Sequence, residues 1–597
     1  MPAPRIDWTK VNQVKAPFSR FHSRRSVVYG TKGMVSSSQP LATAAGLEVL
    51  NKGGNAADAA VAVSAALTVT EPSSCGIGGH SDAFCLFYDA STKQVKALNG
   101  SGRAPKKLTI EYAKQRGHKT SIPLSDLNSV TVPGAAAAWL DTIEHFGSGK
   151  VSVGDVFGPA IRFAEEGFPV SELSSHSRYV GSGSPFNGGR RNPPSQTLIQ
   201  NASPNGNELL VDGKAPLPGQ VVKLPTLAQT FRELVQHGKD GFYKGRVAQA
   251  IVELIQSKGG LMDLDDLADH TSTFVEPIKY TYAGEVTVYE CPPNGQGITA
   301  LLALGILENI QEQGLSRPLS EMEHNSPEYL HTVVEALRLA FADSQWYVTD
   351  PEFKKAPVEE LLSKRYLSER AKLFNPDKMN SDVVHGSPVN SSDTVYFTVT
   401  DQWGNACSFI QSVYEGFGTG AIPKGCGFAL QNRGSNFKLD ENHPNALQGG
   451  KRPYHTIIPA LATRGDELFL SYGVMGGFMQ PQGHVQVLLN ILRGFSVQEA
   501  LDAPRFCISP GMPHAEGVQA PERAGDVNSE VYFEEGIPDS TVQALREMGH
   551  DARTTKGFKR AMMGRGQVIQ KLPSSSGQLV WAAGSDPRAD GHAAPQI

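Results

Sequence analysis

The sequence predicts an α/β protein on three observations. Helical and strand-like patterns alternate along all 597 residues, and no segment is repeated. Apolar residues make up 40% of the chain and charged residues 19%, which is the composition of a globular protein with an ample core. After residue 394 the long helical patterns give way to short strands separated by glycine turns.

Apolar periodicity assigns the main elements in order. Helices are predicted at residues 41–51, 55–69, 225–237, 246–258, 298–311 and 327–346. Alternating side chains from Tyr280 to Tyr289 predict one strand, which ends before Pro292. Residues 176–220 are rich in Gly, Ser, Pro and Asn, which predicts a long surface loop.

The junction at Asp393 and Thr394 separates two very different segments. Residues 375–393 are polar and turn-forming, whereas Thr394 to Thr400 are all β-branched or aromatic. A linker therefore ends where a buried strand begins. A cut between Asp393 and Thr394 would give the strand a free α-amine beside a hydroxyl, which together form a nucleophile and its base. The same pattern also fits an ordinary boundary between a loop and a strand.

Spaced motifs on both sides of this junction resemble one enzyme family. After the junction they are Asp401–Ala406, Gly416–Gly420, Asn432 with Phe437, Gly450–Pro453, Gly476–Gly477 and Ser585–Arg588. Before it they are Gly53–Ala60, Gly76–Gly79, Arg103–Pro105, Val132–Gly134 and Gly241–Gly245. In this order they resemble the γ-glutamyltranspeptidases, self-processing N-terminal nucleophile hydrolases, over nearly the whole chain.

The resemblance implies how the chain is organised. The expected fold is a four-layer αββα sandwich formed jointly by two autoprocessed pieces of one chain. The large piece would be residues 1–393, with residues 1–25 flexible and residues 375–393 forming the linker to the cleavage site. The small catalytic piece would be residues 394–597, and the two pieces would remain associated as a heterodimer.

The residue types indicate the chemistry. Thr394 Oγ would attack the Asp393 carbonyl, and water would then release the two pieces. The new α-amine, with an ordinary pKa near ~8, can accept the hydroxyl proton at neutral pH. Either Thr398 or Ser412 could support the nucleophile, and the resemblance places Ser412 beside it. Gly476 and Gly477 lack Cβ atoms, so their N–H groups can approach one oxyanion closely.

The predicted substrate pocket departs from the family pattern. The family holds the glutamyl group with an arginine on the large piece and with polar and acidic residues on the small piece. In this chain the corresponding positions are Tyr414 for an asparagine, Arg433 for a glutamine or glutamate, Asn436 for an aspartate, and His455-Thr456 for a serine pair. Arg103 stands two residues after the family's arginine, so it is either a second carboxylate ligand or an exposed loop charge.

These substitutions predict an amidohydrolase for small acidic acyl groups. A pocket with two arginines and no buried acid should prefer an anionic acyl group and gain little from an α-ammonium. The chain thus resembles the divergent family branch that includes amidohydrolases acting on oxamate and acylases. A conventional γ-glutamyltranspeptidase or glutathione hydrolase is one alternative. A non-catalytic pseudoenzyme that binds a small anion is the other.

Composition argues against other functions. The net charge is −5 and basic residues are dispersed, so we expect neither nucleic acid nor a membrane as partner. The N-terminus lacks an apolar stretch, which predicts a cytoplasmic protein, with organelle import left open. Six cysteines without a Cys-x-x-Cys pair predict no disulfide framework or zinc site, and phosphate-loop and zinc-protease motifs are absent. We therefore expect no metal and no cofactor, and we assign structural roles to His80 and His484.

Overall fold

The computed structural model describes residues 6–8, 25–77, 82–180, 186–187, 190–191, 195–381, 383, 393–509, 530–574 and 577–597. Most of the predicted flexible N-terminus and most of the final part of the predicted linker lie outside the described residues. So do His80 and the last two glycines of the motif that starts at Gly76.

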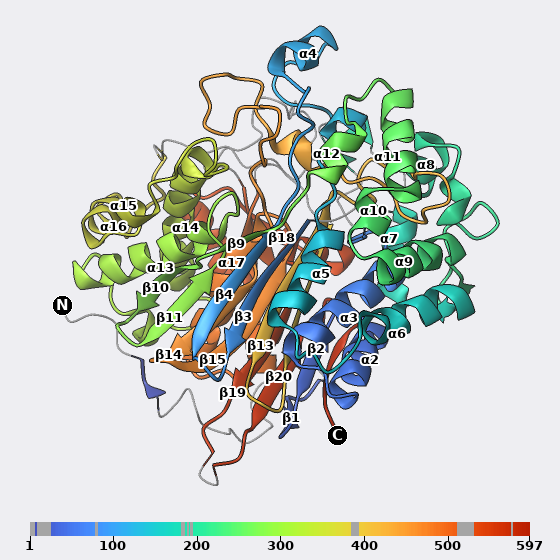
Figure 1. The fold of residues 1–597 in the computed structure, drawn as a ribbon. Helices are drawn as coiled ribbons and strands as arrows, with labels where there is room; N and C mark the ends of the chain where they lie inside the picture. The colour runs from blue at the N-terminus through green and yellow to red at the C-terminus, as the bar shows by residue number, and fades with distance from the viewer. Residues whose placement is uncertain are drawn as a thin grey trace.

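Two seven-stranded antiparallel sheets form the centre of the molecule (Figure 1). The first sheet has the order β1 (Val28–Gly30), β20 (Trp581–Ser585), β19 (Arg565–Lys571), β15 (Glu467–Met475), β14 (Ala460–Arg464), β11 (Val286–Glu290) and β10 (Ile278–Tyr282). The second has the order β21 (His592–Pro595), β2 (Met34–Ser37), β12 (Asp393–Thr400), β13 (Ala406–Tyr414), β3 (Asp82–Asp89), β4 (Gln94–Gly100) and β9 (Thr273–Val275). Each sheet combines strands from both sides of residue 394, so strands drawn in blue adjoin strands drawn in yellow to red.

Helices cover the outer face of each sheet (Figure 1). The second sheet is covered by α2 (Pro40–Asn51), α3 (Ala56–Thr70) and α5 (Ala135–Phe146), and α6 (Val153–Glu166) packs on α3. The first sheet is covered by α13 (Gly297–Glu312), α17 (Met479–Leu492) and α18 (Val497–Asp502), and α14 (Pro327–Tyr347) packs on α13. Helix α3 contacts β12, α17 contacts β15, and β12 contacts β15 across the two sheets. The predicted αββα sandwich is confirmed.

The alternation of side chains along β12 explains this layering. Val395, Phe397 and Val399 pack into the apolar core beneath α2 and α3. Tyr396 points the other way and packs between the sheets with residues of the first sheet such as Ile569. Because side chains alternate across a strand, Thr394 and Thr398 share the inter-sheet face with Tyr396.

Most of the predicted elements are confirmed, including α9 (Pro225–His237) and α11 (Arg246–Ser257). The prediction of one strand at residues 280–289 was wrong, because the segment forms two strands, β10 and β11. Ala283 and Gly284 take positive φ angles of 55° and 69° and turn the chain between them. The alternating side-chain pattern of a strand continues across this short turn, so the sequence pattern does not reveal the turn. The loop predicted at residues 176–220 was also wrong, since α7 (Glu172–Val180) overlaps its start and α8 (Ser195–Ala202) lies within it. Buried Ile199 anchors α8 despite the polar composition.

Smaller elements surround the sandwich. The helices are α4 (Ile110–Gln115), α10 (Asp240–Tyr243), α12 (Leu264–Ala268), α15 (Val358–Leu361), α16 (Lys364–Ala371) and α19 (Asp539–Glu547). The strands are β5 (Phe168–Pro169) with β8 (Val221–Val222), β6 (Phe186–Asn187) with β7 (Arg190–Arg191), and β16 (Phe506–Ile508) with β17 (Val531–Glu534) and β18 (Ala552–Thr555).

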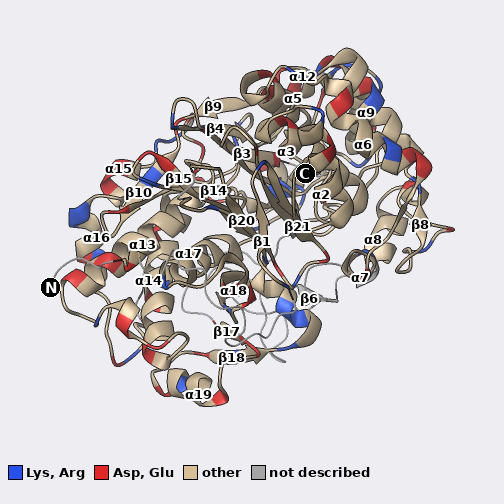
Figure 2. Cartoon of the chain, turned by 90° about the horizontal axis from the view of Figure 1, so that it is seen from below, with Lys and Arg blue, Asp and Glu red and all other residues tan. Residues whose placement is uncertain are grey.

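Charged residues lie mainly on the outer elements. Figure 2 shows basic and acidic segments interspersed over the peripheral helices, while the central strands carry few of either. This mixture agrees with the small net charge and forms no continuous basic face in this view. Among the described residues, no helix combines the length and the apolar character that crossing a membrane requires.

Candidate active site

A row of three polar residues crosses the second sheet. Two of them were predicted from the sequence, and the third is found only in the structure. Thr394 on β12 lies directly opposite Ser412 on β13, and Ser412 lies directly opposite Asp82 on β3. Directly opposed residues of antiparallel strands place their side chains on the same face, with Cβ atoms about 5 Å apart. All three side chains are buried. The register therefore brings a hydroxyl, a second hydroxyl and a carboxylate together between the two sheets.

The hydrogen bonds distinguish the hydroxyl groups of Thr398 and Ser412, which were both predicted candidates to support the nucleophile. Thr394 Oγ1 donates to Ser412 Oγ at 3.1 Å, and Ser412 Oγ also accepts from the Tyr414 N–H at 2.9 Å. Thr398 lies two residues farther along the same face and instead bonds to Ser471 on β15. Ser412, not Thr398, is therefore in position to act on Thr394.

Arg433 brings a buried positive charge to the same hydroxyl pair. Its side chain is only 1% exposed. One guanidinium nitrogen, Nη2, donates to Ser412 Oγ at 2.9 Å, and Nη1 donates to Thr456 Oγ1 at 2.8 Å. The guanidinium carbon lies 4.6 Å from the centroid of the Tyr414 ring, within cation–π range.

Among the described residues, the charge of Arg433 has no direct counter-ion. Burial lowers the pKa of Arg433 to about 10, which leaves the side chain charged at neutral pH. Within the described part of the chain, Arg433 forms no ion pair with a carboxylate, and its Nε has no hydrogen-bond partner. A buried cation with an unused donor is costly unless an anion joins it. A buried arginine with an unused donor therefore lies close to Thr394.

Gln296 connects this group to the glycine pair. Its Nε2 donates to the Thr456 carbonyl at 2.6 Å and to the Gly477 carbonyl at 2.8 Å. Gly476 and Gly477 follow β15 with φ angles of 125° and 58°, conformations that favour glycine. Among the described residues, neither amide N–H of this pair donates to a protein acceptor. Free N–H groups on a strained glycine turn are what an oxyanion site requires.

The remaining predicted pocket residues are held by protein partners. Asn436 Nδ2 donates to the Tyr454 carbonyl at 3.1 Å. His455 Nδ1 accepts from the Ile457 N–H at 3.3 Å, so its Nε2 carries the proton and donates to Asp82 Oδ2 at 2.8 Å. Burial lowers the pKa of His455 to about 4, which keeps the ring neutral. Both ring nitrogens are thus occupied, and the ring has no free nitrogen for a substrate.

Arg103 does not join the group of residues around Thr394. Its side chain is partly exposed, and it pairs with Glu352 at 2.8 Å and donates to the Thr271 carbonyl at 3.4 Å. The displacement seen in the sequence therefore turns this arginine toward other partners. The expected pocket of two arginines without an acid is corrected to one arginine, Arg433, accompanied by the buried carboxylate of Asp82. The sequence did not predict Asp82, because only the strand register places it opposite Ser412.

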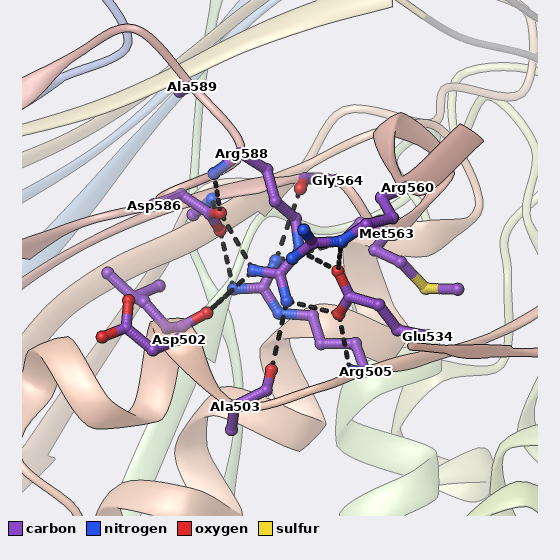
Figure 3. Close-up of polar contacts among 12 residues, drawn as sticks. Asp502, Ala503, Arg505, Glu534, Arg560, Met563, Gly564, Asp586, Arg588 and Ala589 are labelled. Atoms are coloured by element: carbon purple, nitrogen blue, oxygen red, sulfur yellow. Dashed lines mark hydrogen bonds and ion pairs between the residues drawn. The ribbon is translucent and has the colours of Figure 1, made fainter. Parts of the chain in front are cut away.

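The Ser585–Arg588 motif forms a buried ion network with Arg505 and Glu534 (Figure 3). Asp586 pairs with Arg505 at 2.7 Å and with Arg588 at 3.0 Å, and Glu534 also pairs with Arg588. Burial raises the pKa of Asp586, but the two arginines outweigh it and hold that pKa at about 2. Arg505 also donates to the carbonyl of Gly564, whose Cα lies 3.2 Å from the position that a Cβ on Gly476 would take. The network therefore supports the backbone against which Gly476 packs.

In the part of the chain that the structure describes, two groups of side chains have the composition of a metal site. His331, Glu335 and His550 are buried together, and Asp141, Glu144 and His145 lie on α5. In the first group, His331 Nε2 donates to the Asn375 carbonyl, so Nδ1 accepts the proton of His550 Nε2 at 2.8 Å. Glu335 pairs with Arg338. Three candidate ligand atoms of this group are thus engaged by protein partners, whereas His550 Nδ1 has no hydrogen-bond partner among the described residues. The expected absence of a metal stays a prediction.

Comparison with known proteins agrees with the fold. The γ-glutamyltranspeptidase family model matches residues 42–596. The chain belongs to this family. It is 37% identical to the glutathione hydrolase-like YwrD proenzyme of Bacillus subtilis, over 95% of this chain and 99% of that protein. It is 31% identical to the oxamate amidohydrolase proenzyme of Klebsiella pneumoniae, over 94% and 98% of the two chains.

A solved structure supports the same assignment for this γ-glutamyltranspeptidase-family protein. The cephalosporin acylase from Bacillus halodurans is 38% identical and superposes with a TM-score of 0.81, covering 98% of this chain and 99% of that one. These relatives are hydrolases and acylases, several of them described as proenzymes. The chain is accordingly an enzyme of the N-terminal nucleophile class.

Proposed function

We propose that this protein is an autoprocessing amidohydrolase that releases a small acidic acyl group from an amide through a threonyl acyl-enzyme. The observation that carries the proposal is the shared hydrogen bonding of Thr394 and Arg433 to Ser412 Oγ. A nucleophile and an unpaired buried cation then face the same substrate. The similarity to an oxamate amidohydrolase supports the same class of substrate.

Self-cleavage is the first step of the proposed mechanism. Thr394 Oγ1 attacks the Asp393 carbonyl carbon, and the Asp393–Thr394 bond changes from an amide to an ester as the Thr394 nitrogen takes a proton. Water then hydrolyses the ester and leaves a carboxylate on Asp393 and a free α-amine on Thr394. This amine, with an ordinary pKa near ~8, becomes the base for all later turnovers.

Turnover uses the same atoms. The α-amine takes the Thr394 hydroxyl proton while Oγ1 attacks the amide carbonyl, and the N–H groups of Gly476 and Gly477 stabilise the oxyanion. One such donor is worth about 3 kcal/mol in the transition state. The departing amine receives the proton, and water then hydrolyses the acyl ester. Ser412 holds Oγ1 in the direction of attack.

The geometry also favours a short acyl group. Two hydrogen bonds of 3.1 and 2.9 Å through Ser412 Oγ limit the distance between Thr394 Oγ1 and Arg433 Nη2 to 6.0 Å. A nucleophilic approach of about 3 Å and a charge-assisted hydrogen bond of about 2.8 Å together nearly equal this distance, so the acyl group must bend between the two contacts. A carboxylate next to the scissile carbonyl, or one carbon away, fits this spacing better than the longer γ-glutamyl chain.

A substrate panel tests the proposal. We expect hydrolysis of oxamate-like and malonamate-like amides to exceed that of a γ-glutamyl anilide and of a neutral aliphatic amide. Arg433→Gln should cost about 2 to 4 kcal/mol in kcat/KM for the anionic amides, while self-cleavage persists. If γ-glutamyl compounds are clearly preferred and Arg433→Gln has no effect, the protein is a conventional glutathione hydrolase instead.

A further inference from the structure

Asp82 is a buried carboxylate inside the row of residues that contains Thr394. It is the first residue of β3, lies directly opposite Ser412 and is 1% exposed. Its Oδ1 accepts from the Gly102 N–H at 2.8 Å, and its Oδ2 accepts from His455 Nε2 at 2.8 Å. Both oxygens are therefore held, and within the described part of the chain Asp82 forms no ion pair with lysine or arginine.

His455 connects Asp82 to the segment that holds Arg433. The ring is bonded at both nitrogens, to Asp82 and to the Ile457 N–H, and it packs edge-on against Phe84 at 5.0 Å between centroids. The next residue, Thr456, accepts from Arg433 Nη1 at 2.8 Å. A ring fixed at both ends restrains the backbone of residues 455–457, and with it the hydroxyl that orients Arg433.

Electrostatics adds a second link between the same residues. Burial is the largest influence on Arg433 and lowers its pKa, while the carboxylate of Asp82 is the strongest influence that raises it. Asp82 stabilises the positive charge without bonding to it. The guanidinium therefore keeps an unused donor for a substrate anion.

We propose that Asp82 is a positioning residue of the active site that acts through His455 and Thr456 to hold Arg433 charged and aimed at the carboxylate of the substrate. This inference rests on the function proposed above. It also assigns a role to a contact between the two predicted pieces, because Asp82 precedes the cleavage site and His455 follows it.

The test compares Asp82→Asn with wild type on an anionic amide and a neutral amide of equal length. Asparagine has only one acceptor oxygen, so either Gly102 N–H or His455 Nε2–H then faces an amide NH₂. We expect KM for the anionic amide to rise at least about tenfold with kcat changed less than about threefold, and the neutral amide to be unaffected. His455→Gln, which retains a donor toward Asp82, should largely preserve the anionic preference, whereas His455→Leu should lose it.

Asp401→Asn is the matched structural control. Asp401 is also a buried aspartate at the end of β12 and accepts from the backbone N–H groups of Ala56, Trp403 and Asn405. Its replacement should lower Tm without changing the ratio of KM values for the two amides. Equal losses on both amides in Asp82→Asn, or no loss on either, would overturn the positioning role.

The Arg433→Gln variant distinguishes failure of the positioning role of Asp82 from failure of the proposed function. If Arg433→Gln abolishes the preference for the anionic amide but Asp82→Asn does not alter it, only the inference about Asp82 is wrong. If Arg433→Gln leaves the preference unchanged, both the proposed function and the role of Asp82 are wrong.

Discussion

At the scale of single residues, the sequence was most informative where chemistry and strand pattern coincided. Thr394 stands at the first position after a polar segment, and Ser412 matches a family position, so both could be predicted. Asp82 could not, because its partner His455 is 373 residues away and no local pattern links them. Arg103 was misjudged for a related reason, since a shift of two residues in a loop changes the direction of a side chain without changing the motif around it.

The first prediction separates the two hydroxyls near Thr394. Ser412→Ala removes the hydrogen bond to the Thr394 hydroxyl and leaves Arg433 with one acceptor fewer, so we expect kcat to fall roughly 10- to 100-fold. Thr398→Val is the matched control, because Thr398 lies on the same face but bonds to Ser471. Steady-state kinetics of both variants decide the assignment. It would be wrong if Thr398→Val were the slower enzyme.

At the scale of elements, helices and strands could be predicted where their side-chain periodicity is regular, but the pairing of the strands could not. The helix pattern of residues 298–311 and the strand pattern after Thr394 depend on local alternation, which the sequence carries. Thr394 and Ser412 lie on consecutive strands, but the register that places Asp82 opposite Ser412 joins strands more than 300 residues apart in the chain and appears only in the assembled sheet. The hairpin at Ala283–Gly284 was missed because its turn is shorter than the window in which alternation is read.

The second prediction concerns the ion network that supports the glycine pair. Asp586→Asn leaves the buried charge of Arg505 without a carboxylate partner and leaves Arg588 with Glu534 alone, and we expect a loss of about 3 to 5 kcal/mol in stability. Arg560→Gln should cost less than about 1 kcal/mol, because Arg560 pairs with Glu534 from a side chain that is 33% exposed. Thermal unfolding of both variants measures the difference. A larger loss in Arg560→Gln would contradict this account of the network.

At the scale of the whole molecule, the two predicted pieces share each sheet and the apolar core between the sheets. Strands β2 and β3 flank β12 and β13 in one sheet, and β11 lies beside β14 in the other. Neither piece contains a complete sandwich, so the αββα fold requires both. The family resemblance implied this fold, whereas composition and periodicity alone reached only the α/β class.

The third prediction is a loss of stability in mild acid. Burial lowers the pKa values of several described histidines to about 3 or 4, namely His270, His324, His443, His455, His484 and His550. The unfolded chain binds these protons near pH 6.5, and the folded chain does so only near pH 3 to 4. Their contribution is therefore fully present above pH 6.5 and falls by up to about 1.4 kcal/mol per histidine for each pH unit below it.

Thermal unfolding between pH 7 and pH 5 checks this prediction. The raised pKa values of some described carboxyl groups act in the opposite direction, because their folded forms bind a proton more tightly; these are Glu71, Asp266, Glu290, Glu308 and Asp401. They are outnumbered by the imidazoles, because burial also lowers the pKa values of His176, His331 and His592. We expect Tm to fall steadily over this range. A constant or rising Tm would show that these histidines are not held neutral by burial.

The measurement that tests the central claim most directly is the intact mass of the purified protein, together with the N-terminal sequence of its smaller chain. We predict that wild type separates into chains of 393 and 204 residues, the smaller of which begins at Thr394, and that Thr394→Ala remains one chain of 597 residues. A wild-type protein that hydrolyses amides while it remains intact at 597 residues would contradict the proposed mechanism.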